Sequence, residues 1–252
     1  MATHFGGSGD NWIKGTGGDD LLDGGAGCDT LIGCDGDDSL YGGFNSDVLD
    51  GGFGDDLLKG DDGNDCIYDC GGFNSVFGGA GHDFIDVLGT NTVWAGSGDD
   101  TVLGGGGNDR LNGEEGFDLI FGYGGRDTVT GSDGDDDITG GKGADNLSGN
   151  AGIDWFYYDR LADSTNGAAD LITDLEDQDR IYLARIDANV HRSGNQAFHL
   201  VDAFSSAAGE LRVRYDGATD RTSIQGDVDG DGRADFTILA SGNHADFDNF
   251  AL

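Results

Sequence analysis

The sequence contains no proline, only 13 lysine and arginine residues, and no apolar run long enough to cross a membrane as a helix. Against those 13 basic residues stand 49 aspartate and glutamate residues, which give a formal net charge of −36. Nucleic acids and anionic membrane surfaces repel such a chain, so neither is expected as a partner. Cations remain as the natural partners of this composition.

Several sequence signals are missing as well. The N-terminal residues MATHFGGSGD lack the charged and apolar regions of a secretory signal peptide, so we expect any export to use a route that is not read there. The H-E-x-x-H motif of zinc peptidases, the G-x-S-x-G motif of α/β-hydrolases and the G-K-[ST] end of a phosphate loop do not occur. We therefore expect no enzyme and no catalytic residues; the alternative is an enzyme whose site these motifs do not reveal.

Glycine is abundant, at 50 of the 252 residues, which is about three times its usual share. A glycine-rich chain of this charge would ordinarily stay disordered, because self-repulsion and backbone entropy both oppose compaction. Yet 36% of the residues are hydrophobic and 10% are aromatic, which is too apolar for a solvated tail. The composition therefore predicts a folded protein whose charge is neutralised by something outside the chain.

Residues 6–157 repeat one nine-residue phrase, G-G-x-G-x-D-x-U-x, in which U is aliphatic or aromatic. A nine-unit block at 6–86 and a seven-unit block at 95–157 flank a shortened unit without Asp at 87–94. The glycines permit the positive φ angles of a tight turn, and the triplet x-U-x forms a short strand in which only U points inward. Two units then complete one turn of a flattened coil, with turns stacked about 4.8 Å apart. Residues 1–5 precede the first unit and are expected to form a tail.

This arrangement stacks aspartates along both edges of the coil, with Asp20 beside Asp38 and Asp29 beside Asp47. Two carboxylates at that spacing repel each other by about 0.9 kcal/mol in water and by about 3.5 kcal/mol at an effective dielectric constant of about 20. A divalent cation between the turns reverses the sign, and Ca²⁺ suits a cage of carboxylate and carbonyl oxygens better than Mg²⁺ does. The alternative, that these side chains only keep the surface soluble, does not require a fixed position. The predicted calcium ligands, all at the sixth position, are Asp20, Asp29, Asp38, Asp47, Asp56, Asp65, Asp83, Asp100, Asp109, Asp118, Asp127, Asp136, Asp145 and Asp154.

The nonapeptide units resemble those of the RTX (repeats-in-toxin) family of secreted calcium-binding proteins, over more than half of the chain. The resemblance implies an all-β protein, with a right-handed parallel β-roll (a β-helix-like solenoid) at 6–157 and a β-rich C-terminal cap domain at 158–252. About a dozen bound Ca²⁺ ions would bring the net charge to about −12. We therefore expect the repeats to be unfolded without calcium and folded with it.

Beyond residue 157 the nine-residue frame ends, and apolar or alternating segments predict strands at 179–186, 210–216, 222–227 and 235–240. The stretch GAADLITDLEDQDRIYL allows either a short helix or another strand pair. Together with GELRVRYD and GDVDGDGRADFTI, it resembles the serralysin-type C-terminal domain of secreted metalloproteases and some alginate epimerases. Because H-E-x-x-H is absent, the resemblance does not bring the protease activity with it.

A further metal site is predicted in the last of these phrases. Three aspartates on alternate residues can converge on one cation where a glycine turns the chain, and a fourth carboxylate follows. The position at which an EF-hand carries its bidentate glutamate is Ile238, so we expect a short calcium loop between strands; the alternative is an ordinary acidic turn. The predicted ligands are Asp227, Asp229, Asp231 and Asp235.

One outer face of the roll is apolar in its later turns, whereas the other face is polar from the twelfth unit onward. We expect the apolar face to be covered, most simply by the C-terminal segment; the alternative is an external partner. Its residues are Phe84, Leu103, Leu119, Phe121, Trp155 and Tyr157.

The repeat frame places the four cysteines on different edges or more than one turn apart, so we expect mostly free thiols. The least unfavourable pair is Cys66 with Cys70. Their spacing also lacks the pattern of a zinc finger. The four residues are Cys28, Cys34, Cys66 and Cys70.

Taken together, the patterns predict a secreted, extracellular calcium-binding protein that folds after export. The C-terminal residues HADFDNFAL resemble the acidic and apolar ending that accompanies type I export, so the type I secretion machinery is an expected partner. The alternative is a calcium-dependent polysaccharide-binding or accessory module of an extracellular carbohydrate-active or protease system.

Overall fold

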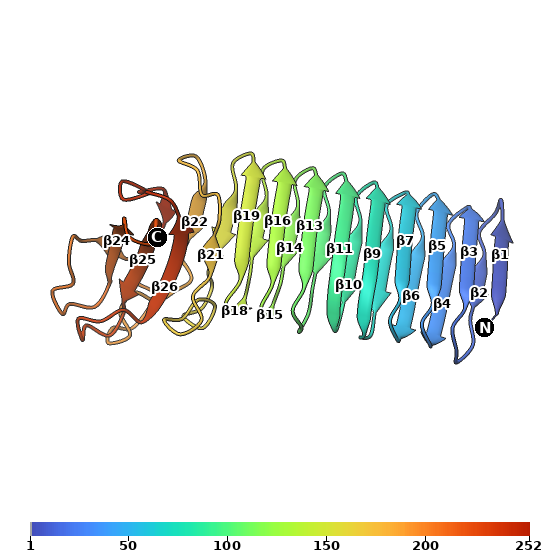
Figure 1. Cartoon of the computed structure of the whole chain (residues 1–252), viewed down its shortest axis with the longest axis horizontal. Helices are drawn as coiled ribbons and strands as arrows, with labels where there is room; N and C mark the ends of the chain where they lie inside the picture. Colours follow the sequence, from blue (N-terminus) through green and yellow to red (C-terminus); the bar gives the residue numbers. More distant parts are fainter. Residues whose placement is uncertain (1) are drawn as a thin grey trace.

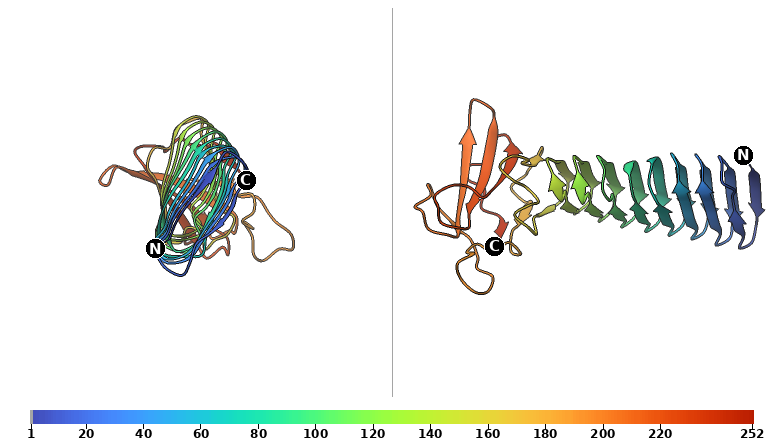
Figure 2. Two further views of the ribbon diagram at one scale, coloured as in Figure 1. Left: turned by 90° about the vertical axis from the view of Figure 1, so that its right-hand side faces the viewer. Right: turned by 90° about the horizontal axis from the view of Figure 1, so that it is seen from below.

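The computed structural model describes residues 2–252; Met1, the first residue of the expected tail, lies outside the described residues. The protein is all-β: a parallel β-solenoid of about nine turns with an 18-residue period, followed by antiparallel C-terminal strands. Figures 1 and 2 show a straight rod, with the N-terminal strands at one end and the C-terminal strands at the other. The expected fold class is confirmed.

Two long sheets form the two sides of the rod. The first has 14 strands, which are, in chain order, β1 (Thr3–Gly7), β3 (Leu21–Ala26), β5 (Ser39–Phe44), β7 (Leu57–Asp62), β9 (Phe73–Ala80), β11 (Thr90–Ser97), β13 (Arg110–Glu115), β16 (Thr128–Asp133), β19 (Asn146–Ala151), β21 (Leu171–Ile172), β23 (His199–Leu200), β24 (Glu210–Asp216), β25 (Arg221–Asp227) and β26 (Phe236–Ser241). In space β1 to β21 follow one another in this order, and β26, β25, β24 and β23 complete the sheet.

The second sheet has 11 strands, which are, in spatial and chain order, β2 (Trp12–Lys14), β4 (Thr30–Asp35), β6 (Val48–Phe53), β8 (Cys66–Asp69), β10 (Phe84–Val87), β12 (Thr101–Leu103), β14 (Leu119–Phe121), β17 (Asp137–Thr139), β20 (Trp155–Tyr157), β22 (Arg180–Tyr182) and β27 (Phe250–Ala251). A small two-stranded sheet joins β15 (Gly124–Gly125) to β18 (Lys142–Gly143). Within the solenoid all pairing is parallel, because every turn of the coil runs in the same direction.

The core of the solenoid is a double column of the eighth-position side chains. In the first sheet Leu22 pairs in register with Leu40, and in the second Leu31 pairs with Leu49; all four are 0% exposed. Burial of one such side chain contributes about 1.5 to 3 kcal/mol, and parallel stacking repeats this gain at every turn. The inward direction of U, with its neighbours outward, is the arrangement that the nine-residue phrase predicts.

Two irregularities shift the register of the coil. The shortened unit at 87–94 reduces the offset between paired residues from 18 to 17, so that Val76 pairs with Val93. After β20 an insertion raises the offset to 25, with Phe156 paired to Ile181. The parallel pairing therefore continues for one turn beyond Tyr157, the expected end of the roll.

The N-terminal residues are part of the coil rather than a tail. Strand β1 pairs with β3, and His4 stands opposite Leu22, at the eighth position of a unit that precedes the recognised frame. The frame did not reveal this unit because its eighth position carries a histidine, which is exposed at the end of the rod. Backbone hydrogen bonding to the next turn is enough to order it.

The expected C-terminal strands correspond to β22, β24, β25 and β26. Of the two options for GAADLITDLEDQDRIYL, the strand pair is right: β21 and β22 form there, and residues 2–252 contain no helix. Strands β24, β25 and β26 pair antiparallel, and β26 pairs parallel to β21. The antiparallel strands thereby extend one sheet of the solenoid.

The C-terminal segment covers only the end of the apolar outer face, where Arg180 and Tyr182 pack on Trp155 and Tyr182 on Tyr157, so that expectation is wrong for the earlier turns. The C-terminal strands continue the rod at its end and do not fold back along its side (Figures 1 and 2). The reason is that the last turn of the solenoid offers two rows of unpaired N–H and C=O groups, which β26 and β27 satisfy through β21 and β22. Phe84, Leu103 and Phe121 remain partly exposed on the second sheet.

Candidate metal centres

Buried aspartates line both edges of the coil and form two ladders. The first ladder contains Asp20, Asp38, Asp56, Asp109, Asp127 and Asp145; the second contains Asp29, Asp47, Asp65, Asp83, Asp100, Asp118, Asp136 and Asp154. None of these side chains is more than 3% exposed, although each is ionisable. All fourteen sixth-position aspartates thus lie where the repeat frame predicts them.

One carboxylate oxygen of each aspartate ties neighbouring turns together. The backbone N–H of Asp38 donates to Oδ1 of Asp56 at 2.7 Å, and that of Asp118 donates to Oδ1 of Asp136 at 2.9 Å. The same bond links Asp29 to Asp47 at 2.7 Å, the neighbours that the 18-residue period predicts. A carboxylate held by a backbone donor is fixed in position, so its second oxygen is also fixed.

In most members of the two ladders that second oxygen, Oδ2, is buried and has no hydrogen-bond partner among the described residues. A buried polar atom without a partner costs about 1 to 3 kcal/mol, and a charged one costs more. The atoms concerned are Oδ2 of Asp29, Asp38, Asp47, Asp56, Asp65, Asp83, Asp100, Asp109, Asp118, Asp127, Asp136, Asp145 and Asp154. Two rows of identical unsatisfied oxygens fit a ligand that carries positive charge.

The glycine at the first position makes room for this oxygen. A Cβ built on Gly33 would lie 2.3 Å from Oδ2 of Asp38 and 2.4 Å from the carbonyl oxygen of Gly51. A carboxylate oxygen and a backbone carbonyl oxygen therefore converge on the same small space, and any side chain at position 33 would fill it. These are the two oxygen types from which proteins build calcium sites.

Burial raises the pKa of the ladder carboxyls. The pKa is about 6 for Asp38, about 7 for Asp65 and about 8 for Asp100. Loss of solvation is the largest cause in each case, and the backbone hydrogen bond to Oδ1 opposes it; repulsion from neighbouring carboxylates raises the pKa further. At neutral pH the ladders are therefore unstable as bare carboxylates, and the regular buried rows fit Ca²⁺.

Each ladder has one further member that the sequence reasoning missed. The backbone N–H of Asp145 donates to Oδ1 of Asp170 at 2.9 Å, and that of Asp154 donates to Oδ1 of Asp179 at 3.1 Å. Asp170 is 0% exposed, and burial raises its pKa to about 8. A signal was present, because Asp-Leu-Ile at 170–172 and Asp-Arg-Ile at 179–181 repeat the D-x-U triplet nine residues apart.

The first ladder is interrupted in its middle by two asparagines. Nδ2 of Asn74 donates to Oδ1 of Asn91 at 3.0 Å and to Oδ1 of Asp69 at 2.6 Å. Around them the first-position glycine is replaced by Val87 and Ala95, both 0% exposed. In this section amide and apolar side chains replace the sixth-position carboxylates and the first-position glycines found elsewhere.

Asp69 is a third residue that the sequence reasoning missed. It occupies the first position of the eighth unit, where all other units except those that begin with Val87 and Ala95 carry glycine, and it is 4% exposed. Burial raises its pKa to about 8. Its Oδ2 and that of Asp56 both lie next to Gly51, so this section holds one more buried carboxyl than the frame supplies.

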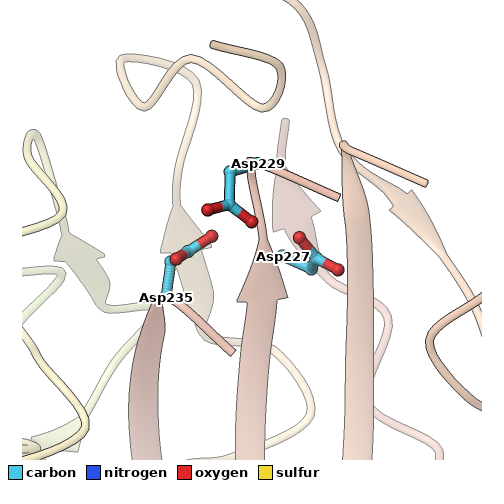
Figure 3. Close-up of side chains that lie close together, drawn as sticks. All are labelled: Asp227, Asp229 and Asp235. Carbon is cyan, nitrogen blue, oxygen red and sulfur yellow. The ribbon is translucent and has the colours of Figure 1, made fainter. Parts of the chain in front are cut away.

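In the C-terminal loop the structure brings together three of the four predicted ligands. Carboxylate oxygens of Asp227, Asp229 and Asp235 all lie within 4.8 Å of one another, and Figure 3 shows the three side chains gathered between the end of β25 and the start of β26. Asp227 is 0% exposed and accepts from the N–H groups of Gly230 and Gly232. Asp231 is not part of this group; its Oδ1 accepts from the N–H of Arg233 at 2.8 Å.

The remaining candidate groups do not assemble into a site. The four cysteines are free thiols, with Cys28 and Cys70 exposed.

Residues 2–252 contain no helix with the length and apolar character needed to cross a bilayer. The acidic ladders and the Asp227 loop are therefore the metal-binding candidates of the described chain.

The family model of the peptidase M10 serralysin C-terminal domain matches residues 3–251. This model describes a non-catalytic domain, and it is the only part of that peptidase family that is detected. The match spans both the repeat region and the C-terminal strands. The comparison with curated proteins gives no match.

Three solved structures are similar in part. The AlgE6R2 subunit of the Azotobacter vinelandii mannuronan C5-epimerase is 28% identical, with 58% of this chain and 89% of that chain covered and a TM-score of 0.44. The AlgE6R3 subunit of the same epimerase is 24% identical, with 61% and 78% covered and a TM-score of 0.31. The extracellular lipase LipA from Serratia marcescens is 16% identical, with 85% of this chain but only 40% of that chain covered and a TM-score of 0.40.

Proposed function

The chain belongs to the peptidase M10 serralysin C-terminal family, an RTX-type calcium-binding β-roll module, and on that basis we propose that calcium drives its folding. In this proposal the chain is exported unfolded by the type I machinery, binds several Ca²⁺ ions outside the cell and then folds. It performs no catalysis itself. The sixth-position aspartates of residues 6–157, together with Asp170 and Asp179 in the following turn, hold the ions.

The observation that carries the proposal is the two rows of unpartnered Oδ2 atoms. Each lies in a buried position, next to a first-position residue that is glycine in most units. Without a cation these oxygens leave the folded state with many uncompensated charges, since residues 2–252 offer no basic side chain within salt-bridge distance of them. With Ca²⁺ the same oxygens become ligands, and binding free energy becomes folding free energy.

A second calcium site is proposed at the loop of Asp227, Asp229 and Asp235. This loop joins β25 to β26, so a cation there would fix the turn between two strands that extend the solenoid. A domain boundary after residue 157 is retained as a proposal, with the added turn of β21 and β22 acting as the junction to the cap.

The test is a titration of the metal-free chain with calcium, followed by far-ultraviolet circular dichroism and by sedimentation for compactness. We expect an expanded, strand-poor chain in chelator and a cooperative gain of β signal on addition of Ca²⁺. Magnesium at the same concentration serves as the matched control and should give little structure, because it dehydrates reluctantly and demands octahedral geometry. Full β structure and cooperative melting in excess chelator would contradict the proposal.

A further inference from the structure

Three arginines lie on one face of the antiparallel C-terminal sheet. Arg212 and Arg214 alternate along β24, so both point to the same side, and Arg221 lies on β25 opposite Asp216, diagonal to Arg214. The three line an open groove of about 550 Å³, together with Thr219 and Ser223. A cluster of three arginines is unusual in a chain that has 13 basic residues and a net charge of −36.

The protein offsets only part of the positive charge of this face: Asp216 lies opposite Arg221 on the neighbouring strand, and its carboxylate interacts electrostatically with Arg214. Among residues 2–252 no carboxylate lies within salt-bridge distance of the three guanidinium groups. The nearest acidic member of the groove, Asp216, is engaged by its own turn: Oδ1 accepts from the N–H of Ala218 and Oδ2 from the hydroxyl of Thr219, each at 3.0 Å. The backbone hydrogen bond, as the largest cause, lowers the pKa of Asp216.

Arg212 is held in place, whereas the other two arginines are free to adapt. The guanidinium of Arg212 lies 4.5 Å from the centre of the Phe204 ring, and its Nη2 donates to Oε1 of Gln225 at 2.5 Å. Arg214 and Arg221 are exposed. The held Arg212 and the two exposed arginines can bind one anion together without rearrangement of the sheet.

We infer that this groove binds a short acidic oligosaccharide through its carboxylate or sulfate groups. Guanidinium groups bind planar oxyanions through two parallel hydrogen bonds, and residues two apart on a strand lie about 7 Å apart. Arginines at this spacing fit anionic groups that repeat along a ligand rather than a single ion. The hydroxyl oxygens of Thr219 and Ser223, whose O–H groups donate within the protein, can accept from sugar hydroxyls, and Leu239 offers an apolar surface for the ring.

The lining of the groove favours a sugar over a nucleotide. No aromatic ring is among the groove-lining residues of the described chain, so nothing there would stack on a base. A long nucleic acid would also run onto the acidic roll, which repels phosphate. A short acidic sugar can dock at this end of the rod, where β24 and β25 lie farthest from the N-terminal turns (Figure 1).

The test uses the full chain in calcium and measures binding calorimetrically. The probes are a short oligomer of galacturonic acid, a sulfated oligosaccharide of the same length and a neutral oligosaccharide of the same length. The double variant Arg214→Gln with Arg221→Gln removes two groove charges; the control Arg110→Gln with Arg192→Gln removes two exposed charges elsewhere. Circular dichroism of each variant in calcium checks that folding is unchanged, which separates this inference from the proposed folding role.

We expect the wild type and the Arg110/Arg192 control to bind the carboxylated or the sulfated probe equally well, with affinity that falls as salt is added. The groove variant should lose about tenfold or more in affinity, as expected for loss of charge-assisted hydrogen bonds. Binding of only one acidic probe would support the inference and identify its anion. Equal losses in both double variants, equal binding of the neutral probe, or no binding of either acidic probe would overturn it.

Discussion

The side-chain nitrogen of Asn74 donates to Oδ1 of Asn91 at 3.0 Å, one turn away in the first ladder. In the turns on either side, aspartates occupy the same position and leave Oδ2 without a partner. Asn74 therefore donates to a neutral amide where an aspartate would need a cation, and Nδ2 of Asn91 donates to the carbonyl oxygen of Gly104 and to Oδ1 of Asp109. This divides the first ladder into two acidic sections, whereas the second ladder runs without a break.

Substitution Asn74→Asp is expected to make the roll more dependent on calcium. The change removes the donor to Asn91 and to Asp69 and places a carboxylate beside Asp69, whose pKa is already raised to about 8 by burial. The calcium concentration at the folding midpoint, measured by circular dichroism, should rise by an amount that corresponds to about 1 to 3 kcal/mol, and the melting temperature in excess calcium should change little. The control is Asn64→Asp, the same change at an exposed position. An equal effect of both substitutions would contradict a special role for the asparagine pair in the first ladder.

The stability of the metal-free roll should fall as pH rises. Buried carboxyls whose pKa lies above the ordinary 3.8, at about 7 for Asp65 and about 8 for Asp100, bind more protons when folded than when unfolded. Their contribution is fully present below 3.8 and is lost as pH rises through about 6 to 8. Circular dichroism of the calcium-free chain should therefore show more β structure in mild acid than at neutral pH.

The variant Asp100→Asn should reduce this pH slope by up to about 1.4 kcal/mol per pH unit, the value for one proton. Asp62→Asn, which removes the same charge from an exposed site, should leave the slope unchanged. If calcium-free protein were instead least stable in mild acid, protons and metal ions would not be competing for the ladders.

Within the second ladder, Asp118→Asn should weaken calcium binding. It should also make the folded state less unstable when calcium is absent. Asn retains an oxygen that can accept from the N–H of Asp100, the bond seen at 2.8 Å, but it removes the buried charge. The calcium concentration at the folding midpoint, measured by circular dichroism, should rise. The exposed Asp62→Asn variant again separates this local effect from the change in net charge, and identical midpoints would count against Asp118 as a ligand.

At the C-terminal loop, Asp227→Asn should remove one bound calcium ion, whereas Asp231→Asn should not. The first residue lies in the group of three converging carboxylates, and the second lies outside it, although both substitutions remove one negative charge. Native mass spectrometry of the calcium-loaded chain counts the ions directly. The same count for both variants would assign the loop as an ordinary acidic turn.

The double ladder could be predicted from the sequence because one nine-residue period controls both the strands and the turns. Asp29 and Asp47 lie in adjacent turns because two units complete one coil, and the hydrogen bond between them confirms that arithmetic. Asp170 and Asp179 escaped prediction because an insertion separates them from the frame, by 25 residues instead of 18. Only the parallel pairing of β21 and β22 shows that they belong to the ladders.

The repeat by itself determined the coil, its register and the burial of one carboxylate in most units, since glycine at the first position makes room for that side chain. The tertiary structure alone decided where the C-terminal strands go, that three arginines share one groove, and that Asp231 stands apart from Asp227. The position of the C-terminal strands depends on backbone groups left unpaired at the last turn of the coil, and unpaired N–H and C=O groups have no signature in the order of side chains.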